Sequence, residues 1–163
     1  MRVLGFDPGT ATTGYGVVEG KGNRLIHIAH GVITTPPKQD FEIRLQTIFK
    51  EASALLAEYE PDAVGIEEIY FKQNVTTGIS VAQARGVLAL AAAQHGKRIG
   101  EFAPQQVKLS VTGYGKADKR QVQQMIKTLL NLDDIPKPDD AADALGIAIC
   151  QIHAGNFRAA IGE

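Results

Sequence analysis

The chain has 163 residues, of which 44% are hydrophobic and 21% are charged, and its formal net charge is −1. This length and composition suffice to bury the core of one domain and exclude a disordered tail. The single cysteine, Cys150, excludes an internal disulfide and a four-cysteine zinc site and is typical of an intracellular protein. We expect one folded domain over residues 1–163, with its ordered part at about 2–155.

No secretion or membrane segment is predicted. Residues 1–15 lack a basic stretch followed by an apolar one, which a signal peptide requires. The longest apolar run, residues 86–93, is far shorter than the ~20 residues of a membrane-spanning helix. We expect a soluble, cytoplasmic protein that does not bind a membrane.

The first half of the chain alternates short apolar segments with turn signals. Asp-Pro-Gly ends the first predicted strand, and Gly-Lys-Gly-Asn separates the second from the third. After a Pro-Pro break, apolar residues at helical spacing indicate one long helix, and the short apolar segment behind it indicates a buried strand that returns parallel to the sheet. The predicted elements are strands 2–7, 14–19, 25–34 and 63–67 and a helix 41–59.

The second half is mostly helical. It begins with an alanine-rich segment that is expected to pack closely, and one further strand follows. The predicted elements are helices 78–95, 104–111, 118–130 and 139–153 and a strand 98–103. Together the two halves predict a mixed five-stranded sheet covered by helices, of the α/β or α+β class.

Acidic residues stand where predicted strands end and where the last helix begins. These residues are Asp7, Glu67, Glu68, Asp139, Asp140 and Asp143. Each has a structural explanation by itself, because a carboxylate can close a turn, end a strand in solvent or stabilise the positive end of a helix dipole. Together they form the oxygen-rich set that Mg²⁺ or Mn²⁺ prefers, and two such ions about 4 Å apart promote phosphodiester hydrolysis.

Six short motifs occur in order along nearly the whole chain. They are Gly5-Phe6-Asp7-Pro8-Gly9-Thr10, Thr13-Gly14-Tyr15-Gly16, Ile66-Glu67, Gln83-Ala84-Arg85-Gly86-Val87, Gln106-Val107-Lys108 and Asp140-Ala141-Ala142-Asp143-Ala144-Leu145. Any one of them is weak, since Asp-Pro-Gly-Thr alone is also similar to a phosphate loop of actin-like and sugar-kinase-like ATPases. In this order, over about residues 2–153, they strongly resemble the RuvC family of crossover-junction endodeoxyribonucleases, which resolve Holliday junctions.

The resemblance implies an α/β fold of the ribonuclease-H-like type, with a five-stranded mixed sheet flanked by helices. The catalytic, metal-binding tetrad of the family corresponds to Asp7, Glu67, Asp140 and Asp143, and the motif selects Glu67 over Glu68. The family implies two Mg²⁺ ions per active site, for which Mn²⁺ can substitute.

The same resemblance implies a homodimer that binds four-way junction DNA. Such an enzyme cuts two strands of like polarity symmetrically by hydrolysis, in homologous recombination and DNA repair. The branch-migration proteins RuvA and RuvB are candidate partners.

Positive charge is concentrated in the middle of the chain. Residues 1–71 carry 6 positive and 10 negative side chains, residues 72–127 carry 9 and 2, and residues 128–163 carry 2 and 6, so their net charges are −4, +7 and −4. A basic segment between two acidic ones is typical of a surface that holds a polyanion, although single lysines are often only solvated.

Four residues in this basic segment or just before it are predicted to contact DNA. Lys108, Lys116 and Lys119 are candidates for phosphate contacts, and by resemblance Lys108 and Lys119 lie near the scissile strand. Tyr70 corresponds to an aromatic position of the family and is predicted to stack on an unpaired base, whereas Phe71 is expected in the core.

The remaining reactive side chains favour structural roles. His27 and His30 lie three residues apart in a predicted strand, so they should point to opposite faces and not share a metal. All four histidines are expected at the surface and Cys150 in the core. The alanine-rich helix 78–95 is the candidate subunit interface, although burial against the sheet explains its composition equally well, and Arg85 serves packing or the dimer.

Three other functions stay open on the residues alone. A non-catalytic module that binds and shapes junctions needs the basic segment but not four carboxylates. An ATPase built on a similar sheet usually needs two such domains, and this chain supplies one. A ribonuclease-H-like nuclease that acts on RNA would use the same acidic residues.

Overall fold

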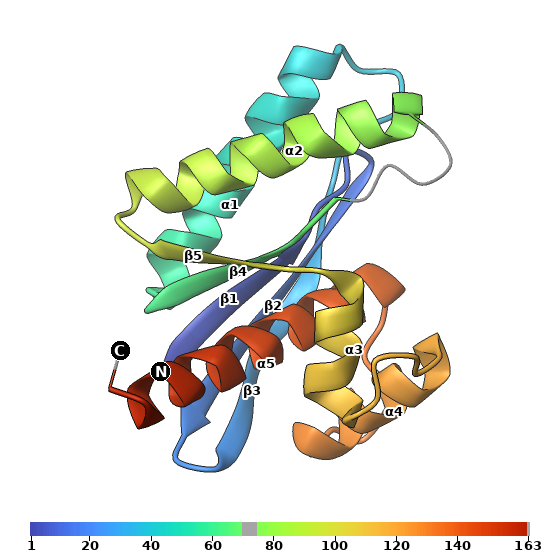
Figure 1. Cartoon of the computed structure of the whole chain (residues 1–163). Coiled ribbons are helices and arrows are strands. Elements are labelled where there is room, and N and C mark those ends of the chain that lie inside the picture. Colours follow the sequence, from blue (N-terminus) through green and yellow to red (C-terminus); the bar gives the residue numbers. More distant parts are fainter. Residues whose placement is uncertain (70–74, 163) are drawn as a thin grey trace.

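The computed structural model describes residues 1–69 and 75–162 and contains every predicted helix and strand (Figure 1). The strands are β1 (Arg2–Asp7), β2 (Thr12–Lys21), β3 (Arg24–Thr34), β4 (Ala63–Glu67) and β5 (Arg98–Phe102). The helices are α1 (Phe41–Tyr59), α2 (Val75–Gln94), α3 (Pro104–Thr112), α4 (Lys119–Leu129) and α5 (Asp139–Ala160).

The sheet has the strand order β3-β2-β1-β4-β5. β1 pairs antiparallel with β2, and β2 pairs antiparallel with β3, which confirms the predicted meander. β4 pairs parallel with β1, and β5 pairs parallel with β4, which confirms the predicted crossover. Because Phe6 pairs with Ile66 in parallel register, the residues that follow them, Asp7 and Glu67, end their strands at the same edge of the sheet.

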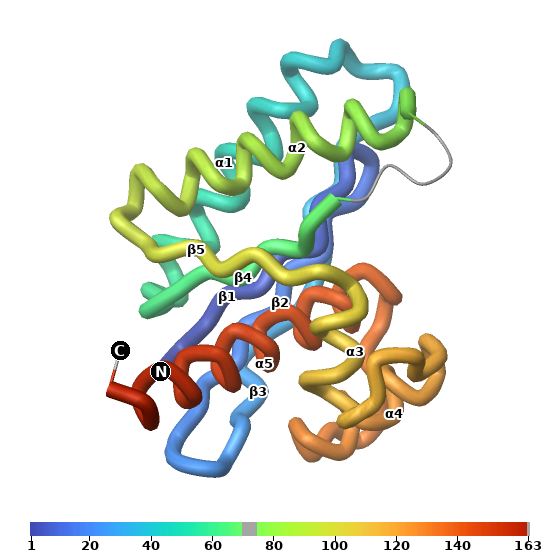
Figure 2. Tube along the Cα trace, viewed as in Figure 1, coloured from blue at the N-terminus to red at the C-terminus, as the bar shows by residue number. Residues whose placement is uncertain are grey.

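Helices cover both faces of the sheet, as Figures 1 and 2 show. α1 and α2 lie together on one face, and α5 lies along the other face with α3 and α4 beside it. Side chains alternate between the two cores along each strand, since Leu4 belongs to the cluster under α1 and α2, and Val3 belongs to the cluster under α5. The sheet is therefore buried on both faces. The acidic residues lie at the edge where β1 and β4 have their C-terminal ends.

Three elements extend beyond their predicted ends by more than one residue, and one of them is α2, which begins at Val75 rather than residue 78. β2 begins at Thr12 rather than residue 14 and continues to Lys21, because Thr12 pairs with Thr34 at one end of the hairpin and Lys21 pairs with Arg24 beside the turn. α5 continues past His153 to Ala160, where Phe157 is 66% exposed. Helix propensity carries this last segment beyond the apolar stripe on which the predicted boundary rested.

The start of α5 lies in close contact with β1 and β2. A Cβ at Gly14 would overlap the carbonyl oxygen of Asp140, and a Cβ at Gly5 would overlap the carbonyl oxygen of Ala144. Glycine is required at these two strand positions because a helix backbone approaches the strand backbone directly. This contact carries Asp140 and Asp143 to the edge where β1 ends.

A β-bulge changes the position of two histidines. The pairing of β3 with β2 skips Ile28, which is an extra residue in β3. The extra residue reverses the alternation of side chains, so that Nε2 of His27 and Nδ1 of His30 lie 2.7 Å apart on one face. The prediction of opposite faces was wrong, and both rings are half-buried rather than at the open surface.

Candidate active site

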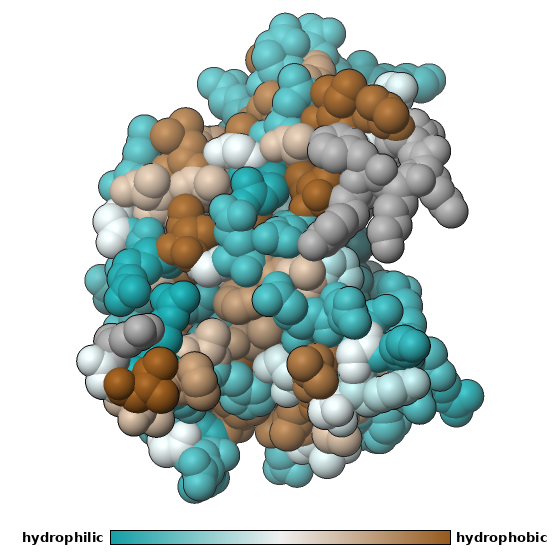
Figure 3. Space-filling model, in the orientation of Figure 1, coloured by the Kyte–Doolittle hydropathy of each residue, from teal (hydrophilic) through white to brown (hydrophobic). Residues whose placement is uncertain are grey.

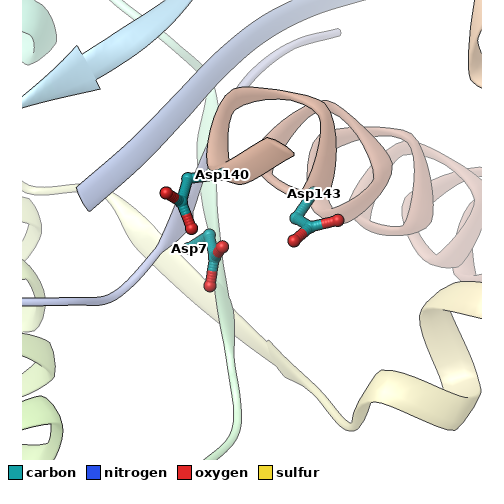
Figure 4. Close-up of side chains that lie close together, drawn as sticks. All are labelled: Asp7, Asp140 and Asp143. Carbon is teal, nitrogen blue, oxygen red and sulfur yellow. The ribbon is translucent and has the colours of Figure 1, made fainter. Parts of the chain in front are cut away.

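Four predicted acidic residues meet at the edge of the sheet where β1 and β4 end and α5 begins. Carboxylate oxygens of Asp7, Asp140 and Asp143 lie within 4.8 Å of one another, and the three side chains point toward a common space (Figure 4). Glu67 ends the neighbouring strand beside Asp7, and its charge is one of the causes that raise the pKa of Asp7. Among the residues that the structure describes, no other set of three acidic, histidine or cysteine side chains is grouped so closely.

Threonine hydroxyls hold the turn that follows Asp7. The Thr13 Oγ1 donates to the carbonyl oxygen of Gly9 over 2.6 Å. The Thr35 Oγ1, which is buried, donates to the carbonyl oxygen of Thr10 over 2.6 Å. These bonds tie the turn to the start of β2 and to the end of β3, so β1, β2 and β3 together determine the backbone position of Asp7.

Burial and mutual repulsion oppose ionisation of the clustered carboxyl groups. Burial, followed by the charges of three neighbouring acids, raises the pKa of Asp7 from 3.8 to about 9. Burial and the charge of Asp143 raise the pKa of Glu67 from 4.5 to about 7. Burial also raises the pKa of Asp143, and the positive charge of Lys119 opposes this shift. The cluster is therefore poorly compensated in the protein alone and would be stabilised by a cation.

Two of the predicted DNA-binding lysines line the same cavity as acidic residues of the cluster. The cavity has a volume of about 230 Å³, and Lys108 of α3 and Lys119 of α4 line it together with Glu67 and Asp143. The positive charges of both lysines lower the pKa of Glu67, although burial outweighs them. The cavity thus combines groups that could hold a cation with groups that could hold an anion.

The other two predicted DNA contacts lie elsewhere. Lys116 is exposed on the segment between α3 and α4. Tyr70 lies outside the described residues, as do Phe71 and Lys72. The structure therefore brings Lys108 and Lys119 to the acidic cluster and does not bring Lys116 into its cavity lining.

Asp139 was predicted only as a charge at a helix start, and the structure shows a further contact. The Asp139 Oδ2 lies 3.1 Å from Nζ of Lys119, and Oδ1 accepts a hydrogen bond from Nε2 of Gln123 over 3.1 Å. Lys119 Nζ also lies 3.8 Å from Oδ2 of Asp143. No spacing rule connects residues 119 and 139, so only the packing of α4 on α5 could reveal this contact.

The acidic cluster fits a hard divalent cation. Carboxylate oxygens are the ligands that Mg²⁺ and Mn²⁺ prefer. The cluster offers several of them at a partly buried position, and the raised pKa values of Asp7 and Glu67 show that burial and neighbouring negative charges oppose their ionisation. Asp7, Glu67, Asp140 and Asp143 are the residues that could hold such an ion.

Comparisons with known proteins identify the family of this chain. The family model described as "Crossover junction endodeoxyribonuclease RuvC" matches residues 3–151. The chain belongs to the RuvC family. A family member of this name from Alkaliphilus oremlandii is 54% identical over 157 residues, which cover 96% of each chain. Another from Heliobacterium modesticaldum is 53% identical over 154 residues, covering 94% of this chain and 95% of the relative.

A solved RuvC structure shows the same arrangement of elements. The RuvC of T. thermophilus, in complex with a Holliday junction substrate, superposes with a TM-score of 0.92 at 32% sequence identity, covering 96% of each chain. The mixed sheet with helices on both faces is therefore the ribonuclease-H-like fold of RuvC, as the resemblance implied. RuvC membership also confirms that the chain is a nuclease of the crossover-junction class.

α2, the candidate subunit interface, has a buried face and an exposed apolar one. Its exposed apolar side chains include Val75, Ile79 and Leu90, which are 67%, 51% and 52% exposed. Apolar side chains are visible along the upper part of the surface in Figure 3, where α2 lies in Figure 1. Arg85 forms an ion pair with Glu101 of β5, which is the packing role considered for it.

α2 is also longer than the apolar run on which the membrane prediction rested. It has 20 residues, and by length and composition it is the one described helix that could cross a membrane. Core helices of soluble proteins can have the same length and apolar composition. α2 packs against α1 and β5.

Cys150 and the last two histidines have structural surroundings. Cys150 is buried, as predicted. The His153 ring is exposed and its Nδ1 lies 2.9 Å from Oγ of Ser110. The half-buried His95 ring contacts the carbonyl oxygen of Ala91, at 2.9 Å, and is less exposed than expected.

Proposed function

We propose that the chain resolves four-way DNA junctions by divalent-metal-dependent hydrolysis, with Asp7, Glu67, Asp140 and Asp143 as the catalytic residues. The observation that carries the proposal is the convergence of carboxylates from β1, β4 and α5 at one edge of the sheet. Membership of the RuvC family supports the junction as substrate, and the T. thermophilus relative was solved with a Holliday junction bound.

The carboxylates hold the metal and the lysines hold the DNA. Two Mg²⁺ ions, when bound, supply Lewis-acid activation of a water and stabilisation of the departing 3′ oxygen, and Mn²⁺ can take their place. Asp7 lies beside Glu67 of the neighbouring strand and near Asp140 and Asp143 of α5, and these four carboxylates are the residues that would hold the ions.

Positive side chains complete the site. Lys119 lies between two helix-start carboxylates at the rim of the cavity, where its ammonium group can stabilise negative charge on the reacting phosphate. Lys108 lines the same cavity and is assigned a contact to the scissile strand. Lys116 on the exposed segment contacts phosphate farther away, and Tyr70 stacks on an unpaired base near the junction centre.

Symmetric cleavage requires two active sites, so the functional unit is a homodimer. Residues 1–69 and 75–162 of one chain carry one such acidic cluster, and a two-fold axis through a second copy would place a matching cluster on the strand of like polarity. The exposed apolar face of α2 is the proposed interface. The branch-migration proteins RuvA and RuvB are proposed partners of this dimer, in the cytoplasm.

The deciding experiment offers the purified protein four substrates with and without Mg²⁺. These are a synthetic four-way junction, linear duplex DNA, an RNA–DNA hybrid and ATP. Paired nicks confined to the junction, and only with Mg²⁺, are expected. Junction binding without cleavage would favour a non-catalytic module, preferred cleavage of the hybrid would favour an RNA nuclease, and ATP hydrolysis would favour an ATPase.

A further inference from the structure

Asp139 ties the start of α5 to the first turns of α4. Both of its carboxylate oxygens are engaged by α4, since Oδ2 pairs with Nζ of Lys119 at 3.1 Å and Oδ1 accepts from Nε2 of Gln123 at 3.1 Å. Lys119 and Gln123 are four residues apart and share a face of α4. The amide of Gln123 therefore orients the carboxylate that receives the lysine.

Lys119 has a second carboxylate within reach, and it belongs to the acidic cluster. Its Nζ lies 3.8 Å from Oδ2 of Asp143, which is longer than its 3.1 Å contact to Asp139. The charge of Asp140 also acts on the lysine. If Asp139 lost its charge, Asp143 would be the nearest ion-pair partner left to the ammonium group among the contacts of the described residues.

An ammonium group on Asp143 would compete directly with a metal ion. A carboxylate oxygen that accepts from an ammonium group has less electron density and less space to offer a cation. The Asp143 side chain is 36% exposed and the Asp139 side chain 65%. An ion pair between Lys119 and Asp143 would therefore be screened less by water than the pair with Asp139. The position of Lys119 thus affects how freely Asp143 can bind.

We propose that Asp139 is a positioning residue, which holds Lys119 at the rim of the site and so keeps the Asp143 carboxylate available to a divalent cation. This role rests on the proposed function, because it treats Asp143 as a metal ligand. The sequence alone assigned Asp139 a charge at a helix start, and the contacts with α4 assign it this second role. The proposal predicts that loss of the Asp139 charge weakens metal binding, because Lys119 would then pair with Asp143.

The test is a double-mutant cycle on metal affinity, measured without substrate. Binding of Mn²⁺ to the full-length protein is followed through the loss of the electron paramagnetic resonance signal of free Mn²⁺. The variants are Asp139→Asn, Lys119→Met and the double variant, with Asp139→Glu as the conservative replacement. Exposed Asp134→Asn, whose side chain lines a different groove, is the control for loss of one negative charge.

Asp139→Asn is expected to weaken Mn²⁺ binding by about threefold to fivefold, the upper part of the range that an exposed ion pair can supply. Asp139→Glu restores most of the affinity, and Asp134→Asn changes it by less than about twofold. In the Lys119→Met background, Asp139→Asn has no further effect, because the competing amine is gone. Circular dichroism and thermal melting check that each variant is folded.

Two results would overturn the role of Asp139. An equal loss of affinity in both backgrounds would show that its negative charge acts on the metal directly. Unchanged affinity in Asp139→Asn would show that Lys119 does not compete for Asp143. Failure of the proposed function is seen separately, since it would appear as wild-type protein that binds no Mn²⁺ or leaves four-way junctions uncut.

Discussion

Gly14 of β2 and Asp140 of α5 are in such close contact that a Cβ on the glycine would overlap the carbonyl oxygen of the aspartate. The contact joins two residues that lie far apart in the sequence, and it fixes the start of α5 against the sheet. Since Asp143 lies one helical turn further along α5, the same contact sets its distance from Asp7. The geometry of the acidic cluster therefore depends on the absence of a side chain at Gly14.

Gly14→Ala should displace the start of α5 and weaken both folding and catalysis. The added methyl group has no space, so we expect a loss of about 2–3 kcal/mol in the free energy of unfolding, typical of an overpacked core position, and at least a tenfold drop in cleavage rate. Denaturant unfolding and junction cleavage measure the two effects. Gly86→Ala is the matched control, because a Cβ there meets nothing within 4 Å, and it should leave stability unchanged or slightly higher.

Asp7→Asn should abolish cleavage while junction binding persists. The amide keeps the shape of the side chain but removes a charged oxygen from the centre of the cluster, so we expect at least a thousandfold loss of cleavage rate with Mg²⁺. Binding and cleavage of a labelled four-way junction are compared in the same preparation. Asp40→Asn, at an exposed aspartate without a capping hydrogen bond, should cleave normally. Substantial cleavage by Asp7→Asn would remove Asp7 from the chemistry.

The metal-free protein should lose stability as the pH rises. The folded pKa of Asp7 is raised from 3.8 to about 9, so its contribution is fully present below about pH 4 and is lost progressively up to about pH 9. The pKa of Glu67 is raised from 4.5 to about 7, so its contribution to stability is also lost as the pH rises through this range. In chelator, we expect a lower Tm at pH 8.5 than at pH 6, and added Mg²⁺ should restore it at the higher pH.

Asp7→Asn provides the internal comparison for this pH effect. It removes the group with the largest shift, so its Tm in chelator should exceed that of the wild type at pH 8.5 and should respond less to Mg²⁺. A wild-type Tm that is independent of pH and of Mg²⁺ would contradict the electrostatic account of the cluster.

Leu90→Glu should separate the proposed dimer. Leu90 is 52% exposed on α2, and a charge there opposes burial in a subunit interface. We expect the variant to have the mass of a monomer in sedimentation or light-scattering measurements. We also expect it to give single rather than paired nicks in a junction. The control is Leu109→Glu on α3, which is 55% exposed and lies outside α2. A Leu90→Glu protein that stays dimeric would place the interface elsewhere.

The secondary structure could be predicted from sequence because its signals are local. The apolar stripe of α1 and the breakers around β4 depend on residues within one or two turns of each other. The order of the motifs also predicted the family, which the comparisons confirmed. The catalytic roles of the four acidic residues remain predictions. The same holds for the DNA-binding roles of Tyr70, Lys108, Lys116 and Lys119.

Features that depend on pairing between distant segments could not be predicted in this way. The bulge at Ile28 exists only relative to β2, so the common face of His27 and His30 was missed. The contact of Asp139 with Lys119 joins residues 20 positions apart on different helices, by packing that neither helix encodes alone.

The sequence by itself determined which segments become helices and strands and which carboxylates end them, because hydrophobic periodicity and turn residues act over short distances. Only the tertiary structure decided that Asp7, Asp140 and Asp143 share one space and that Lys119 stands beside them. Such proximity follows from strand register and from the close approach of α5 to glycine, and these arise only when the whole chain packs.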